Sequence, residues 1–132
     1  MKISARAKAA AVLTAGVVTA TVLTATPSYA SSVPLRLYEH TGYNGSSISL
    51  YSSDSNLWWN KGFGDVASSV KNPSSSAVAW VLYDDTGYGD RHYCIRPGQS
   101  ISNLGADAWK FGDKISSVKE LGTASCAGYP TF

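Results

Sequence analysis

The sequence contains two copies of one unit of about forty residues, and this repeat restricts the possible fold more than any other feature. The run Tyr38–Gly45 returns 45 residues later as Tyr83–Asp90. The run Phe63–Lys71 returns 48 residues later as Phe111–Lys119. The blocks keep their order and their offsets differ by three residues, so the second copy carries a short insertion. Because so small a unit rarely buries a core alone, we expect the two copies to pack face to face as one domain.

The N-terminal segment is typical of an export signal. It has a basic start, an apolar stretch and a small-x-small triplet, namely Lys2, Arg6 and Lys8, residues 9–25, and Ser28-Tyr29-Ala30. A transmembrane anchor is the alternative, but the stretch is interrupted by threonines, is short for a span and precedes a cleavage site. We therefore expect a cleaved signal peptide at 1–30, secretion to the extracellular space, and a single mature domain at 31–132.

The charge balance changes when this segment is removed. Cleavage takes three of the eleven basic residues and none of the nine acidic ones, so eight stand against nine and the net charge is −1. No basic stripe remains for nucleic acid or for an anionic membrane surface. We expect neither partner, and we expect a monomer.

Two cysteines, Cys94 and Cys126, lie in the exported part. In an oxidising compartment an isolated pair most simply forms one disulfide, which would tether the tail 122–132 to the second repeat. A metal site is the weaker alternative, because neither cysteine has a second Cys or a His at ligand spacing.

The mature chain shows the pattern of short β-strands and no helical periodicity. Leu35 and Leu37 occupy alternate positions of one run, as do their counterparts Trp80 and Leu82 45 residues on, so these four should share the core-facing side. A less regular strand is expected at 57–63 and again at 108–111. The pattern predicts an all-β, eight-stranded antiparallel sandwich. Its buried side chains should include Leu37, Ile48, Val70, Leu82, Tyr93, Ile95, Ile115 and Val118.

Each copy also begins with an aromatic hairpin and ends in an Asp-x-x-Ser-Ser run. Tyrosines five residues apart, with a glycine between them, suit a hairpin that folds back over its own sheet. Together the two blocks resemble the Greek-key motif of the βγ-crystallins, whose domain has two such motifs. The resemblance places motif 1 at about 34–73 and motif 2 at about 78–121. One departure is Asp90 where a glycine is expected, which predicts a hairpin tip displaced by one residue.

The resemblance implies two calcium sites between the paired motifs. Calcium takes six to eight oxygen ligands, and carboxylates, hydroxyls and carbonyls can supply them. The oxygen donors implied are the side chains of Asp65, Ser68, Asp113 and Ser116, and the carbonyls of Glu39, Asp84, Val66 and Lys114. The first position of each run is Gly, where the family has Asn or Asp, which predicts weak binding. The alternative is that Ser68 and Ser116 only satisfy backbone groups at a strand start.

Catalysis finds little support in the sequence. His40 and His92 do not recur between the copies, and no nucleophile-elbow pattern accompanies them. Asp84 and Asp85 are adjacent, so their carboxylates are expected on opposite sides of the hairpin. Trp58-Trp59 is expected to place one indole inside and one at the surface, where it would resemble a binding anchor. The alternative is that both indoles are half-buried and cover the sheet. We expect a non-catalytic protein, not an enzyme, with calcium as its one expected cofactor.

Small exported proteins with two such motifs and a cysteine pair are similar to two groups. One comprises extracellular metalloproteinase inhibitors of the peptidase inhibitor I36 group, which implies a protease partner. The other comprises killer toxin-like proteins, and a toxin-like or envelope-associated binder is the alternative function. A calcium-stabilised structural protein is the third reading. The chain lacks the first-motif cysteine pair that the inhibitor group can have, and no inhibitory loop can be matched residue by residue.

Overall fold

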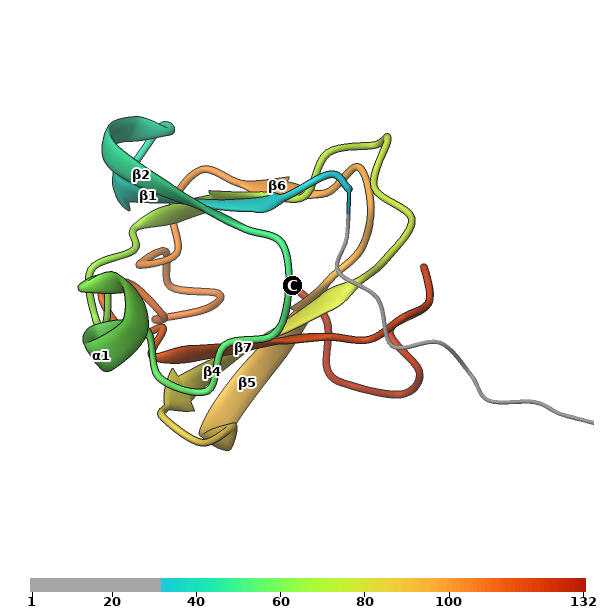
Figure 1. Ribbon diagram of the computed structural model, residues 1–132. Coiled ribbons are helices and arrows are strands. Elements are labelled where there is room, and N and C mark those ends of the chain that lie inside the picture. Colours follow the sequence, from blue (N-terminus) through green and yellow to red (C-terminus); the bar gives the residue numbers. More distant parts are fainter. Residues whose placement is uncertain (1–31) are drawn as a thin grey trace, which may run out of the picture.

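The computed structural model describes residues 32–132, so the expected signal peptide lies outside the described residues. The described chain forms seven strands and one short helix (Figure 1). They are β1 (Leu35–His40), β2 (Asn44–Leu50), α1 (Leu57–Lys61), β3 (Ser69–Lys71), β4 (Trp80–Asp85), β5 (Gly89–Ile95), β6 (Ser100–Ile101) and β7 (Ser117–Glu120).

Two antiparallel sheets face each other across the core, in the orders β2-β1-β3-β6 and β5-β4-β7. The repeat is visible in their registers. Leu37 pairs with Ile48 in the first sheet, and Leu82 pairs with Tyr93, each 45 residues on, in the second. The all-β antiparallel class and the repeat are therefore confirmed.

The two motifs exchange strands across the core. β6 belongs to the second motif but pairs with β3 of the first sheet. In return, Asp54 of the first motif forms a single bridge with Val118 of β7. The bridge lies just before the segment 57–63, where a strand was expected, and the described residues form seven strands rather than the eight predicted.

The prediction of a strand at 57–63 was wrong, because local capping favours a helix there. The Asn56 side chain accepts a hydrogen bond from the Trp59 N–H at 3.0 Å, and Gly62 ends the helix in the left-handed conformation. The segment 108–111 forms turns rather than a strand, and the second motif contributes β6 instead.

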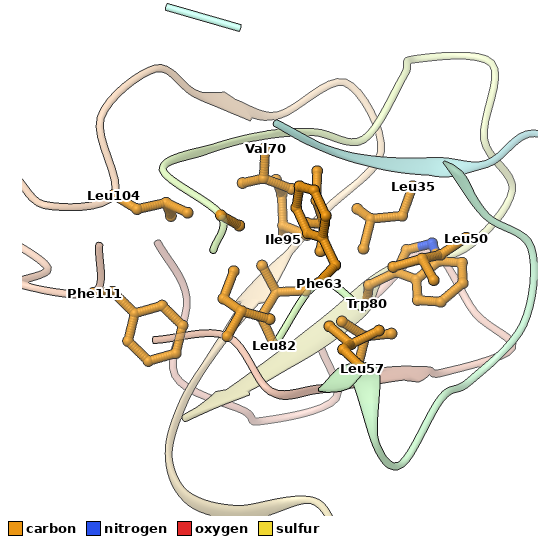
Figure 2. Close-up of a cluster of buried hydrophobic side chains, with 14 of the residues drawn as sticks. Leu35, Leu50, Leu57, Phe63, Val70, Trp80, Leu82, Ile95, Leu104 and Phe111 are labelled. Carbon is orange, nitrogen blue, oxygen red and sulfur yellow. The ribbon is translucent and has the colours of Figure 1, made fainter. Parts of the chain in front are cut away.

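Apolar side chains of both sheets and of α1 fill the space between them (Figure 2). Six of the eight predicted core residues are fully buried, whereas Ile48 and Tyr93 are half-buried against the same cluster. Leu35, Leu37, Trp80 and Leu82 are fully buried, as their alternation predicted. Val81 and Tyr83, on the other face of β4, are also buried.

The C-terminal tail accounts for this second buried face. Cys94 and Cys126 form the predicted disulfide, with their Cα atoms 5.9 Å apart. The Cys94 N–H donates to the Pro130 carbonyl at 2.6 Å, and the Phe132 N–H donates to the Cys94 carbonyl at 3.1 Å. The tail therefore covers both the outer face of the second sheet and the edge of β5.

Candidate functional site: two hollows between the paired motifs

Each motif carries a hairpin whose tip folds back over its own sheet. Tyr38 and Tyr43 pack edge to face with their ring centroids 5.6 Å apart, and Tyr83 and Tyr88 repeat this contact at the same separation. This arrangement agrees with the predicted aromatic hairpins. It fixes where the backbone next to Glu39 and Asp84 lies.

The last serine of each Asp-x-x-Ser-Ser run holds the folded hairpin in place. The Ser69 hydroxyl accepts from the Tyr43 N–H at 3.0 Å and donates to the His40 carbonyl at 2.7 Å. Ser117 makes the same two bonds, with the Tyr88 N–H and the Asp85 carbonyl, at 3.1 and 2.6 Å. Both serines are completely buried. This role was not predicted from the sequence, although the recurrence of Ser69 as Ser117 in the second copy pointed to it.

The expected displacement of the second hairpin tip is wrong. His40 pairs with Asn44 and Asp85 pairs with Gly89, so the two hairpins share one register. Asp90 accepts the left-handed conformation, with φ at 66°, that Gly45 adopts in the first copy. A Cβ at position 45 would lie 2.6 Å from the His40 ring, and in the second copy the shorter Asp85 stands in the position of His40.

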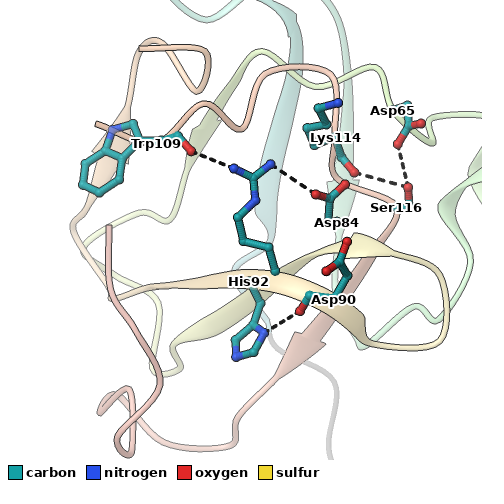
Figure 3. Close-up of polar contacts among 8 residues, drawn as sticks. Asp65, Asp84, Asp90, His92, Trp109, Lys114 and Ser116 are labelled. Atoms are coloured by element: carbon teal, nitrogen blue, oxygen red, sulfur yellow. Dashed lines mark hydrogen bonds and ion pairs between the residues drawn. The ribbon is translucent and has the colours of Figure 1, made fainter. Parts of the chain in front are cut away.

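The other serine of each run reaches across to the opposite motif. The Ser116 hydroxyl donates to the Asp65 carboxylate at 2.7 Å, and the Ser68 hydroxyl donates to the Asp113 carboxylate at 3.1 Å. Both bonds run between the two motifs, and the first is drawn in Figure 3. Each predicted carboxylate therefore lies beside the predicted hydroxyl of the other copy.

Two open hollows form around these crossed pairs. The Glu39 hollow, of about 250 Å³, is lined by Glu39, His40, Asp65, Val66, Ser68 and Asp113. The Trp58 hollow, of about 390 Å³, is lined by Trp58, Asp65, Asp84, Asp85, Thr86, Lys114 and Ser116. The eight residues predicted from the resemblance all line one hollow or the other, and Asp65 lines both. Each hollow has room for an ion with several waters, since one liquid water takes about 30 Å³.

The donor sets of the two hollows differ in their fit to a hard cation. The Glu39 hollow has three carboxylate residues and a hydroxyl, and no Lys or Arg lines it. Such oxygen donors suit calcium. The Trp58 hollow also offers three carboxylates, but Lys114 lines it and Arg91 binds the Asp84 carboxylate at 3.1 Å (Figure 3). The Glu39 hollow therefore fits calcium better.

The glycine at the first position of each run has a local packing cause. A Cβ on Gly64 would lie 2.2 Å from the Trp58 ring, so the indole rests directly on this residue. A Cβ on Gly112 would lie 3.1 Å from the Gly105 Cα. The family's Asn or Asp side chain is thus excluded at Gly64 by Trp58 and crowded at Gly112 by Gly105.

Two expectations about side-chain placement need correction. The carboxylates of Asp84, Asp85 and Asp90 come together, with ligand oxygens within 4.8 Å of one another. The register shift between Tyr83 and Asp85 breaks the strand alternation on which the opposite expectation rested. Neither Trp58 nor Trp59 is inside: their exposed fractions are 55% and 87%. Leu57 and Phe63 occupy the core beside them instead.

The two histidines have different surroundings. His40 is exposed and lines the Glu39 hollow, with its Nε2 4.0 Å from the Glu39 carboxylate. His92 is half-buried between the rings of Tyr83 and Tyr129, and its Nδ1 lies 2.9 Å from the Asp90 carbonyl.

No helix within residues 32–132 has the length and apolar character needed to cross a membrane.

Two folded-hairpin motifs that exchange strands and pair their Asp and Ser side chains define a βγ-crystallin domain. A βγ-crystallin from Ciona intestinalis is 30% identical, with a TM-score of 0.56 over 66% of this chain and 98% of that one. A βγ-crystallin domain from Clostridium beijerinckii is 25% identical, with a TM-score of 0.55 over 68% and 99% of the chains. IPSE/alpha-1 from Schistosoma mansoni eggs is 27% identical, with a TM-score of 0.55 over 73% and 97%.

The particular family follows from the sequence model of peptidase inhibitor family I36, which matches residues 24–95, more than half of the chain. The chain belongs to peptidase inhibitor family I36, built on a βγ-crystallin domain. This family and this fold are of non-enzymatic kinds. No curated protein sequence matches the chain significantly.

Proposed function

We propose that the protein is a secreted, non-catalytic inhibitor of an extracellular protease, with a metalloprotease as the favoured target. The family match carries the proposal. The disulfide supports an oxidising compartment, and the pattern of residues 1–30 supports export with cleavage to one mature domain. One structural neighbour is an IgE-binding crystallin, 27% identical to this chain over 67% of its length, which indicates that this fold can bind proteins.

We further propose that the hollows bind calcium weakly, the Glu39 hollow more tightly than the Trp58 hollow. The first would use Asp113 and Ser68 side chains with the carbonyls of Glu39 and Val66. The second would use Asp65 and Ser116 side chains with the carbonyls of Asp84 and Lys114. Bound calcium would neutralise the carboxylates and cross-link the motifs.

The inhibitor proposal is tested with purified residues 31–132 and a fluorogenic peptide substrate. Thermolysin serves as the zinc endopeptidase probe, and trypsin, papain and pepsin represent the other protease classes. We expect dose-dependent loss of thermolysin activity, with the inhibitor intact on a gel afterwards. Unchanged rates with all four proteases would contradict the proposal and favour the toxin-like reading, which growth inhibition of fungi or bacteria would then test.

A further inference from the structure

The Trp58 hollow differs from the Glu39 hollow in having an indole in its wall. Leu57 corresponds to Leu104, because their N–H groups donate to the carbonyls of Ser116 and Ser68 in the two crossed contacts. The residue after each is Trp58 in one copy and Gly105 in the other. The Trp58 indole therefore packs against Gly64, whereas in the other copy the backbone of Gly105 packs against Gly112.

The surrounding backbone fixes the position of this indole. The Leu57 N–H donates to the Ser116 carbonyl at 2.9 Å, and the Gly87 N–H donates to the Ser55 carbonyl at 2.7 Å. These bonds tie both ends of the segment before α1 to the second motif. One ring face rests on Gly64, and more than half of the side chain stays exposed. The wall is thus preformed and accessible.

The charges around the hollow remain negative after its internal pairs are counted. Arg91 forms an ion pair with the Asp84 carboxylate, and the Ser116 hydroxyl donates a hydrogen bond to the Asp65 carboxylate. Lys114 lines the hollow as well. Asp85 and the neighbouring Asp90 are exposed, and neither forms an ion pair within residues 32–132. In and around the hollow there are thus four carboxylates and two basic groups, those of Arg91 and Lys114.

An aromatic face beside carboxylates recognises an organic cation better than a metal ion. An indole offers no oxygen to calcium, but its ring attracts an ammonium or guanidinium group. The carboxylates can pair with the same group, most effectively with the planar guanidinium. Trp59, on the same helix, exposes a further apolar surface outside the hollow. A small free cation would not contact this surface, whereas a protein that presents the cation could.

We propose that the Trp58 hollow binds a Lys or Arg side chain presented by a protein partner, with Trp59 packing against the partner's surface around it. The inference goes beyond the proposed function, because it holds for a basic side chain on a protease or on any other protein. Calcium and the basic side chain would compete for this hollow, and the Glu39 hollow would stay available to calcium.

The probe is the peptide acetyl-Gly-Gly-Arg-Gly-Gly-amide, titrated into ¹⁵N-labelled residues 31–132 in EDTA and followed by NMR. The matched peptide carries citrulline, which keeps the shape and removes the charge. We expect saturable shifts of the Trp58 indole N–H and the Thr86 amide with the arginine peptide alone. Trp58→Ala should weaken binding about threefold to tenfold, and Trp58→Phe should fall between.

Two control variants localise the effect. Trp59→Ala deletes an equally large side chain of the same helix outside the hollow, and Glu39→Gln removes a charge from the other hollow. Both should bind the arginine peptide as the parent does. Equal shifts with citrulline, full binding by a folded Trp58→Ala variant, or an equal loss in either control would overturn the proposal.

Discussion

Adjacent serines in each repeat do different work. Ser68 and Ser116 reach across to the opposite motif, whereas Ser69 and Ser117 are buried and bond the hairpin of their own motif. Removing either buried hydroxyl leaves a hairpin N–H and carbonyl without their partner, so Ser69→Ala and Ser117→Ala should each lower the free energy of unfolding by about 1–3 kcal/mol. Ser68→Ala, at a more exposed bond, should cost less. Urea unfolding of the three variants measures this, and equal losses would contradict the division of roles.

Ionisation of Tyr83 should lower the free energy of unfolding at alkaline pH. Burial raises the pKa of Tyr83 to about 12, and a hydrogen bond with Tyr129 adds to the shift. Its ordinary pKa of about 10 applies in the unfolded chain, which therefore loses the proton first as pH rises. The contribution is complete below pH 10 and is lost between about 10 and 12, on the order of 2 kcal/mol. Thermal melting from pH 8 to 12 should show this decline.

Tyr83→Phe keeps the ring and removes the titrating hydroxyl, so its decline should be shallower. Some dependence of stability on pH should remain, because the pKa of Tyr88 is also raised, mainly by burial and to a smaller extent by the negative charge of Asp54. Identical pH profiles for the parent and Tyr83→Phe would show that this hydroxyl is not the cause.

At the scale of elements, the repeat predicted the paired strands and the core-facing side chains, because both follow from period-two alternation. Alternation could not predict α1, whose formation depends on the Asn56 cap and on Gly62 rather than on apolar spacing. It also missed the burial of Val81, because the covering tail lies far along the chain. The site residues could be placed through the resemblance, but the indole wall depends on a close contact between Trp58 and Gly64 that no spacing reveals.

The disulfide-tethered tail should contribute substantially to stability. Replacing both Cys94 and Cys126 with Ala frees a 32-residue loop in the unfolded chain, which costs roughly 3–4 kcal/mol by the chain-entropy estimate. Detachment of the tail would also expose Val81 and Tyr83, which it covers. Urea unfolding of the double variant under non-reducing conditions measures the loss. A midpoint equal to that of the parent would show that the tail docks without covalent help.

At the scale of the whole molecule, calcium should stabilise the fold by joining the motifs. A ligand that binds only the folded state stabilises it by about 2.7 kcal/mol at a hundredfold excess over Kd. For a domain of this size each kcal/mol raises Tm by about 4–8 °C. Millimolar calcium should therefore raise Tm relative to EDTA, and magnesium should do little because it keeps its waters.

Asp113→Asn tests the placement of this effect in the Glu39 hollow, and Asp107→Asn, at an exposed carboxylate outside both hollows, is its matched control. The first should lose most of the calcium-dependent rise in Tm, whereas the second should keep it. Identical melting curves in calcium and EDTA for the parent would mean that the crossed Asp–Ser pairs act only as structural links.

The exchange of strands between the sheets also bears on how such a chain could arise. Neither repeat completes its own sheet, since β6 closes the first sheet and Asp54 borders the second. A single repeat, as a separate chain, would need a second copy to supply the missing border, so its folding would depend on concentration. Joining two copies in one chain replaces that dependence with a fixed effective concentration, set by the short connection between β3 and β4. Once joined, the copies can diverge, and one hollow can keep its oxygens while the other acquires an indole.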